Sequence, residues 1–250
     1  MRRVPGGTPG LADEGCSGGP MALILVAEDD PFIRRFVAAA VESAGWDCIL
    51  TADGTEAWNA FQEADGTVDV VVTDVRMPGM SGLELAERIR AESTVAIIAI
   101  SALGSDEQVV AGLEAGADDY VTKPLSAPIL VAKIRGALRR AEATSGRVQG
   151  RMEIGGLSLD LDAKTVTKYG SPVALTRTEL GVLAYLMSNA GRIVSPDQIL
   201  GTVWGEAYEG ENEILRVAIL RLRRKIEDDP SRPRYIVTHP GLGYTFKTAP

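Results

Sequence analysis

The chain has 250 residues, of which 45% are hydrophobic and 24% are charged. This composition is ordinary for a globular protein and excludes a chain that is disordered throughout. No apolar run approaches the roughly 18 residues that a membrane span needs. Two cysteines are too few for a disulfide framework, and a single histidine, His239, excludes mechanisms that need two histidines. We therefore expect a soluble, cytoplasmic protein without a membrane partner.

The net charge of -8 is unevenly distributed along the chain. Residues 21–145 carry 10 Lys and Arg against 20 Asp and Glu, whereas residues 146–250 carry 14 against 12. An acidic half followed by a mildly basic half indicates two domains with different partners.

Residues 1–20 are rich in Gly and Pro and have no apolar periodicity. They lack the apolar stretch of a secretory signal. We expect either a disordered tail or a start codon placed too far upstream, with Met21 as the initiator.

Short apolar runs then alternate with amphipathic stretches. The apolar runs predict strands at residues 22–27, 47–50, 68–73, 95–100 and 119–122. Apolar residues spaced by three and four predict helices at residues 31–44, 54–64, 82–91, 106–115 and 126–141. Apolar strands that alternate with helices indicate a parallel sheet covered on both faces. We predict a flavodoxin-like, doubly wound (βα)5 domain over residues 21–141, with its site at the carboxyl ends of the strands.

Residues 142–150 are small and polar and predict a linker. The remainder, residues 151–250, begins with short strands and turn signals. Helices follow near residues 176–189, 195–203 and 212–227, and the first two begin with capping boxes, Thr176 with Glu179 and Ser195 with Gln198. The closing RYIVTHPGLGYTF predicts a hairpin. This order predicts an α+β winged helix-turn-helix domain.

Acidic residues follow the first and third strands of the predicted sheet. Glu28, Asp29 and Asp30 close the first strand, and Asp74 closes the third. Converging carboxylates there would form an oxygen-rich pocket of the kind that Mg²⁺ prefers. A carboxylate beside Mg²⁺ can act as a nucleophile towards phosphoryl groups. We assign Asp30, which precedes Pro31, to capping the next helix.

Two further side chains fall at strand ends on the same edge. Ser101 follows the fourth strand and offers a hydroxyl, and Lys123 follows the fifth. A lone lysine is usually a solvent-exposed charge, but this position favours a role beside the acids.

The motifs LILVAEDD, VVVTDVRMPGMSGLEL, ISA and GADDYVTKPL resemble the receiver domain of bacterial two-component response regulators. The resemblance implies that a sensor histidine kinase phosphorylates Asp74. The implied Mg²⁺ ligands are Asp29, Asp74, the Arg76 backbone carbonyl and, through water, Glu28. The implied phosphate-contacting and switch residues are Ser101, Tyr120 and Lys123.

Residues 151–248 resemble the winged-helix output domain of the OmpR/PhoB branch, through LTRTELGVLAYLMSNAGRIVSPDQIL, LRLRRKIE and GLGYTF. This implies binding to double-stranded promoter DNA and to RNA polymerase. On the third helix, an apolar stripe of Leu215, Ile219, Leu222 and Ile226 must face the core. The residues opposite or beside it are predicted to contact DNA: Arg216, Val217, Leu220, Arg221, Arg223, Arg224 and Lys225.

The wing departs from many relatives. Where they carry an arginine for the minor groove, this sequence has Pro240, which cannot donate a hydrogen bond, and His239 is a possible substitute. The wing, together with ILRV and DDPSRPRYIVT around the basic helix, resembles the KdpE-like, potassium-responsive subgroup.

Relatives in this branch dimerise through the face formed by the fourth helix, fifth strand and fifth helix. The matching residues are Glu107, Val109, Asp119, Ile129, Lys133 and Arg140. Four of them can form ion pairs, whereas Val109 and Ile129 replace a charged pair and either meet as apolar residues or simply cover helix surface. We expect a homodimer promoted by phosphorylation and less sensitive to salt than charge-rich relatives.

The sequence therefore predicts a non-enzymatic, DNA-binding transcriptional regulator. One alternative is a Mg²⁺-dependent phosphatase with an aspartyl-phosphate intermediate, but such enzymes commonly carry a second Asp where this chain has Arg76. Another is a scaffold with a decayed receiver, which would lack Asp29, Asp74 or Lys123, and all three are present.

Overall fold

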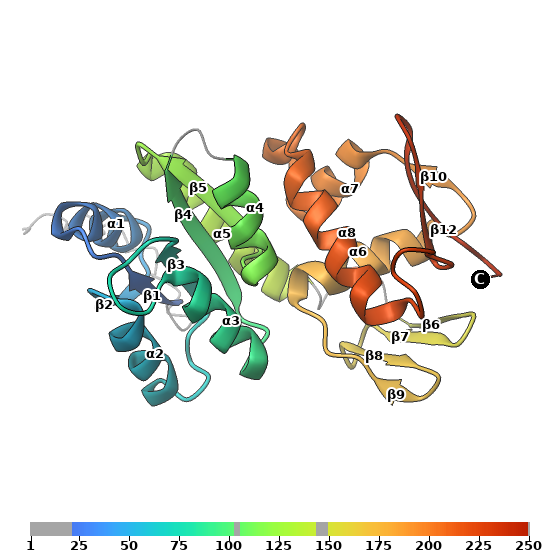
Figure 1. Ribbon diagram of the computed structural model, residues 1–250, viewed down its shortest axis with the longest axis horizontal. Coiled ribbons are helices and arrows are strands. Elements are labelled where there is room, and N and C mark those ends of the chain that lie inside the picture. Colours follow the sequence, from blue (N-terminus) through green and yellow to red (C-terminus); the bar gives the residue numbers. More distant parts are fainter. Residues whose placement is uncertain (1–21, 103–105, 144–149, 250) are drawn as a thin grey trace, which may run out of the picture.

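The computed structural model describes residues 22–102, 106–143 and 150–249. The chain forms two domains that lie against each other, the first in blue to green and the second in yellow to red (Figure 1). The residues of the expected N-terminal tail and most of the expected linker lie outside the described ranges.

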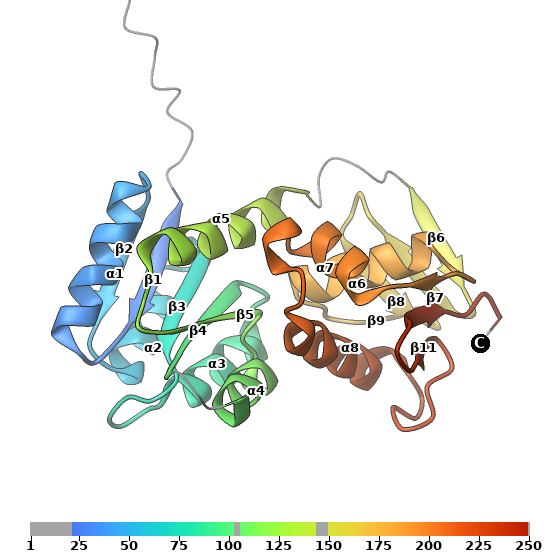
Figure 2. The ribbon, with the colours of Figure 1, turned by 90° about the horizontal axis from the view of Figure 1, so that it is seen from above.

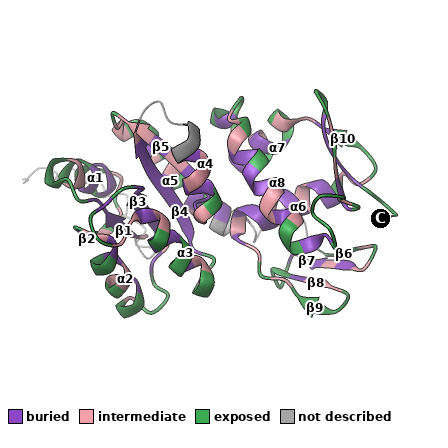
Figure 3. Ribbon diagram, viewed as in Figure 1, coloured by how far each residue is buried: buried purple, intermediate pink, exposed green. Residues whose placement is uncertain are grey.

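A five-stranded parallel sheet forms the centre of the first domain. Its strands are β1 (Leu23–Ala27), β2 (Asp47–Thr51), β3 (Val70–Asp74), β4 (Ala96–Ala102) and β5 (Asp119–Lys123), in the order β2-β1-β3-β4-β5. The order reverses between β1 and β3, where doubly wound sheets place their ligand sites. The central strands are buried on both faces, as their continuous apolar sequences predict (Figure 3).

Helices cover both faces of this sheet. Their bounds are α1 (Pro31–Ser43), α2 (Gly54–Glu63), α3 (Gly82–Glu92), α4 (Asp106–Ala115) and α5 (Ala127–Ala143). Helices α1 and α5 pack on one face, and α2 and α3 on the other, where α4 packs beside α3. The predicted flavodoxin-like fold is confirmed, and α5 continues past residue 141. The Asp30 side chain accepts hydrogen bonds from the Phe32 and Ile33 amides and so caps α1, as predicted.

The second domain is a winged helix. A four-stranded sheet comes first, made of β6 (Arg151–Ile154), β7 (Leu157–Asp160), β8 (Thr165–Lys168) and β9 (Ser171–Pro172). The helices are α6 (Arg177–Ser188), α7 (Pro196–Val203) and α8 (Asn212–Ile226), with a 3-10 turn, η1 (Glu206–Tyr208), before α8. The wing is the hairpin of β11 (Ile236–His239) and β12 (Gly243–Phe246), joined by β10 (Ile193–Val194). Both predicted capping boxes are present.

The core face of α8 is the one that the apolar stripe predicts. Leu215, Ile219, Leu222 and Ile226 are all at most 2% exposed. The opposite face of α8 turns towards the first domain and packs against α4 (Figures 1 and 2). Val109 and Leu113 of α4 belong to the same cluster of buried apolar side chains as the α8 stripe. One continuous apolar core therefore extends across the contact between the two domains.

The described helices include none that combines the length and the apolar character needed to cross a membrane.

Candidate functional site

The acidic residues at the strand ends meet at the switch point of the sheet. Glu28 and Asp29 follow β1, and Asp74 ends β3, which pairs with β1. Carboxylate oxygens of Glu28, Asp29 and Asp74 lie within 4.8 Å of one another. Glu28 is fully buried and Asp74 is 7% exposed, whereas Asp29 is open to solvent. The predicted convergence of these acids is thus present in the structure.

Lys123 closes the site from β5. Its ammonium group donates to Asp74 Oδ2, and it lies 3.2 Å from Glu28 Oε1. Asp74 Oδ1 accepts a 2.8 Å hydrogen bond from the Arg76 amide, which fixes the carboxylate orientation. The Lys123–Pro124 peptide bond after β5 is cis. The lysine that the sequence places on this edge therefore does reach the acids.

The charges of the site are not balanced within the protein. Burial, followed by the charge of Asp74, raises the pKa of Glu28 to about 7, although Lys123 opposes this rise. Burial lowers the pKa of Lys123, but Asp74 and Glu28 outweigh it, so the pKa lies above its ordinary value. Among the described residues, Lys123 is the cation that pairs with Glu28 and Asp74, so the three carboxylates have one ammonium group between them. A hard divalent cation with oxygen ligands would relieve this repulsion, so the residues present fit Mg²⁺.

Gly82 allows the start of α3 to lie directly against the end of β3. A Cβ atom at this position would lie 1.8 Å from the Asp74 carbonyl oxygen and 2.7 Å from Thr73 Oγ1. Any larger residue would push the strand end and its carboxylate out of place. The sequence analysis did not identify Gly82, because the motif that contains it gives no local sign of this close approach.

Ser101 and Tyr120 differ in how they relate to this site. Asp74 pairs with Ile100 across β3 and β4, so the next residue, Ser101, lies on the same edge. Ser101 is 1% exposed, and its hydroxyl donates weakly, at 3.3 Å, to the Ala102 carbonyl. The Tyr120 hydroxyl instead donates to Glu211 Oε2 at 2.7 Å, at the start of α8. The structure therefore places Ser101 on the edge of the sheet where the acids lie but directs Tyr120 to the second domain.

The residues predicted to contact DNA do not form one open surface. Arg216, Arg224 and Lys225 are exposed, Leu220 is half-buried and Val217 is 6% exposed. Arg223 donates to the Ile236 carbonyl at 2.7 Å and so ties α8 to the wing. Lys225 forms a 2.7 Å ion pair with the buried Glu179.

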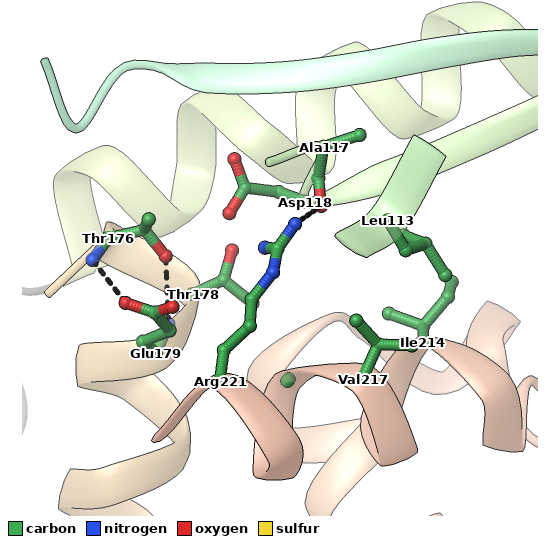
Figure 4. A pocket seen from close by; sticks show the side chains of 10 residues that line it. Leu113, Ala117, Asp118, Thr176, Thr178, Glu179, Ile214, Val217 and Arg221 are labelled. Atoms are coloured by element: carbon green, nitrogen blue, oxygen red, sulfur yellow. Dashed lines mark hydrogen bonds between the residues drawn. The ribbon is translucent and has the colours of Figure 1, made fainter. Parts of the chain in front are cut away.

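Arg221 reaches into the receiver-like domain. Its guanidinium donates to the Ala117 carbonyl at 3.0 Å, across a small cavity of about 10 Å³ between the domains (Figure 4). Val217 and Leu113 line the same cavity, and Arg224 lies 3.9 Å from Glu114. In this arrangement the part of the predicted DNA-contacting face of α8 that contains Val217 and Arg221 is covered, whereas Arg216, Arg224 and Lys225 stay exposed.

The charged residues of the predicted dimer face are also engaged within the chain. Asp119 is fully buried. It forms a 2.8 Å ion pair with Lys133 and accepts a hydrogen bond from the Tyr208 hydroxyl. Arg140 is 7% exposed, and its positive charge acts to lower the pKa of the Tyr208 hydroxyl. Burial, followed by Asp119, raises the pKa of Tyr208 above its usual value, so the hydroxyl keeps its proton.

The rest of the predicted dimer face is divided. Val109 is buried beneath the second domain, whereas Ile129 stays 52% exposed. The side chain of Glu107 lies outside the described residues. Val109 and Ile129 are thus in different surroundings, although the sequence analysis treated them as one pair.

Comparisons with known proteins identify both domains. Residues 24–135 match the response regulator receiver domain, and residues 170–246 match the transcriptional regulatory protein C-terminal domain. The chain is 38% identical to the sensory transduction protein RegX3 of Mycolicibacterium smegmatis over 229 residues, covering 91% of this chain and 100% of the relative. It is 39% identical to the transcriptional regulatory protein KdpE of Mycobacterium tuberculosis over 227 residues, with the same coverage.

A solved structure of a RitR mutant has the same fold over both domains. It superposes with a TM-score of 0.73 at 25% identity, covering 91% of this chain and 100% of that chain. Together with the acidic site at the switch point and the winged helix, these matches establish that the chain belongs to the OmpR/PhoB family of response regulators and is a DNA-binding transcriptional regulator.

Proposed function

We propose that Asp74 accepts a phosphoryl group from a sensor histidine kinase and that this reaction controls promoter binding. The observation that carries the proposal is the convergence of Glu28, Asp29, Asp74 and Lys123 at one edge of the sheet. An Asp74 carboxylate oxygen would attack phosphorus while the bond from phosphorus to the kinase histidine breaks, which leaves an acyl phosphate and a neutral histidine.

Each neighbouring residue has a role in this step. Asp29, Asp74 and the Arg76 carbonyl would hold Mg²⁺, with Glu28 assisting through water. Bound Mg²⁺ would offset the charge of the incoming phosphoryl oxygens. The Lys123 ammonium, now on Asp74, would bind a phosphoryl oxygen, and Ser101 would donate its hydroxyl to the new phosphate.

The output follows from the second domain. Promoter DNA, a histidine kinase and RNA polymerase would be the partners, and the phosphorylated chain would act as a homodimer in the cytoplasm. We place the domain boundaries at residues 21–141 and 151–250. The KdpE and RegX3 relatives are similar to this chain at 39% and 38% identity, so neither subgroup is favoured.

The phosphatase alternative has less support. It needs a second carboxylate two residues after the nucleophile, to act as acid and base. Arg76 occupies that position with its side chain exposed, and its amide is already hydrogen bonded to Asp74. We therefore propose no enzymatic role on a separate substrate.

Intact-mass measurement after incubation with a small phosphodonor and Mg²⁺ tests the proposal. The wild-type protein should gain one phosphate and Asp74→Ala none. Asp30→Ala is the matched control, because it removes a neighbouring carboxylate that caps α1 and should leave labelling unchanged. Equal labelling of Asp74→Ala and wild type would contradict the assignment.

A further inference from the structure

A second and larger cavity lies next to the small one between the two domains. Its volume is about 390 Å³, within the roughly 300–1,000 Å³ that is typical of small-molecule sites. The ends of α3 and α4 line it from the receiver domain, and the start of α6 and the end of α8 line it from the second domain. Thr176, Glu179 and Arg221 line both cavities and are drawn in Figure 4. The larger cavity is therefore big enough for a small organic molecule, and both domains are needed to form it.

Four cationic side chains line this cavity, three of them on α8: Arg90, Arg221, Arg224 and Lys225. Two of the four are closely paired. Asp118 forms an ion pair with Arg90, and Glu179 lies 2.7 Å from Lys225. The charges of these two cations are thus balanced by carboxylates of the protein.

The other two cations have weaker partners. Arg221 donates to a neutral group, the Ala117 carbonyl, and Arg224 lies 3.9 Å from Glu114 in a loose ion pair. Burial lowers the pKa of Arg221, and the nearby positive charges of Arg90 and Arg224 act in the same direction. The guanidinium groups therefore repel one another, and a bound anion would relieve this repulsion.

The chemistry of the lining matches that of a nucleotide. A phosphate monoester carries a charge of about -1.5 to -2 at neutral pH, which two guanidinium groups offset. Guanidinium groups bind phosphate through two parallel hydrogen bonds and also stack on aromatic rings such as a base. Ala115, Ala174 and Leu175 add apolar surface, and Ser93 and Thr94 add hydroxyls that can hydrogen bond to a ribose. An inorganic phosphate would match only the cations and leave the rest of the lining without a partner.

We propose that this cavity binds a nucleotide, whose phosphate is held by Arg221 and Arg224. The cavity is separate from the acidic site, because Ser93 and Thr94 precede β4, whereas Asp74 ends β3. In a parallel sheet these positions lie at opposite edges. The nucleotide would therefore be a second input to the chain, independent of phosphorylation at Asp74.

Isothermal titration calorimetry of the full-length protein with AMP, GMP, CMP and UMP tests the proposal. EDTA in the buffer removes the Mg²⁺ that would otherwise hold a phosphate at the acidic site. At least one nucleotide should bind with a dissociation constant below about 1 mM. The matching nucleoside and inorganic phosphate should each bind at least about tenfold more weakly, because each lacks half of the contacts. Binding of none of the four nucleotides, or equal binding of the nucleoside or of phosphate, would overturn the proposal.

Two variants, one in each domain, test whether the nucleotide lies in this cavity. Arg224→Gln removes a cation, and Thr94→Glu adds a negative charge at an exposed position of the receiver domain. Each should weaken nucleotide binding about tenfold. Arg192→Gln is the matched control, because it removes an exposed arginine beyond the far end of α6, a helix about 18 Å long. Normal binding by Arg224→Gln or Thr94→Glu, in protein shown by thermal melting to be folded, would overturn the assignment, as would an equal loss in Arg192→Gln.

The expected effect on DNA is the one part that rests on the proposed function. Arg221 and Arg224 cannot hold a nucleotide and a DNA phosphate at once. A nucleotide at about ten times its dissociation constant should therefore weaken binding to a duplex of random sequence about tenfold. Nucleotide binding without this loss would support the site and contradict the DNA role of these two residues. Asp74→Ala should bind the nucleotide as wild type does, so a failure of Asp74 labelling would leave the site standing.

Discussion

Arg221 gives a sharp prediction because we expect it to have a different partner once the two domains separate. We call the arrangement of the structure closed, and an arrangement in which α8 has left the receiver domain open. In the closed structure its guanidinium donates to the Ala117 carbonyl at 3.0 Å. A hydrogen bond from a charged donor contributes about 1.5–3 kcal/mol. Burial lowers the pKa of Arg221, though Asp118 and Glu179 oppose this, so part of the contribution offsets desolvation and we take the lower value. Arg221→Ala should therefore favour the open state roughly tenfold.

In the open state, Arg221→Ala removes a different contact, the one that we expect with DNA. An arginine that reads a base contributes about 1–3 kcal/mol to DNA binding. In the unphosphorylated protein the easier opening should offset this loss, so the affinity of Arg221→Ala should stay within a few-fold of wild type. In the phosphorylated protein, which we expect to be open, the affinity for DNA should fall about tenfold or more. Phosphorylation should thus enhance binding about tenfold less in the variant than in wild type.

Fluorescence anisotropy with an operator found by genomic DNA capture, at one fixed salt concentration, measures both affinities. Arg216→Ala is the matched control: this side chain is 67% exposed, and its ion pair is with Glu213 of its own helix. The affinity of Arg216→Ala for DNA should fall by the same factor in the unphosphorylated and the phosphorylated protein. If the affinity of Arg221→Ala also fell by the same factor with and without phosphorylation, the receiver domain would not hold Arg221. That result would refute the reasoning.

Three further predictions follow from other contacts. Lys123→Ala should still take up some phosphate by intact mass but show no rise in operator affinity, and a normal rise would remove Lys123 from the switch. Ile129→Glu should weaken the phosphorylated dimer in sedimentation and leave unphosphorylated DNA binding unchanged, because Ile129 lies 52% exposed outside the closed contact; an undiminished dimer would exclude Ile129 from the interface. Glu227→Gln should lower the free energy of unfolding by about 1.5–3 kcal/mol in urea, because this buried carboxylate accepts the amides of residues 234–236. A loss below about 0.5 kcal/mol would contradict that role.

The receiver site was predictable because it depends on local rules. Apolar strands that alternate with helices require a parallel sheet, and a parallel sheet brings its strand ends to one edge. The convergence of Glu28, Asp74 and Lys123 can therefore be predicted without any knowledge of side-chain packing. The apolar stripe of α8 was predictable for the same reason, since helical periodicity alone selects its core face.

The contact between the domains was not predictable in this way. Tyr208 and Asp119 are far apart in the chain, and no periodicity links them. Val217 lies opposite the core stripe, so it was expected at DNA, yet a second apolar surface on α4 buries it. β10 has two residues and η1 three, too few for any pattern to identify.

The central claim is that phosphorylation of Asp74 controls promoter binding. Its most direct test measures the affinity of wild type and of Asp74→Ala for the captured operator, with and without a phosphodonor. The account predicts that the phosphodonor raises the affinity of wild type and leaves that of Asp74→Ala unchanged. An equal rise in both proteins, or no rise in wild type, would contradict it.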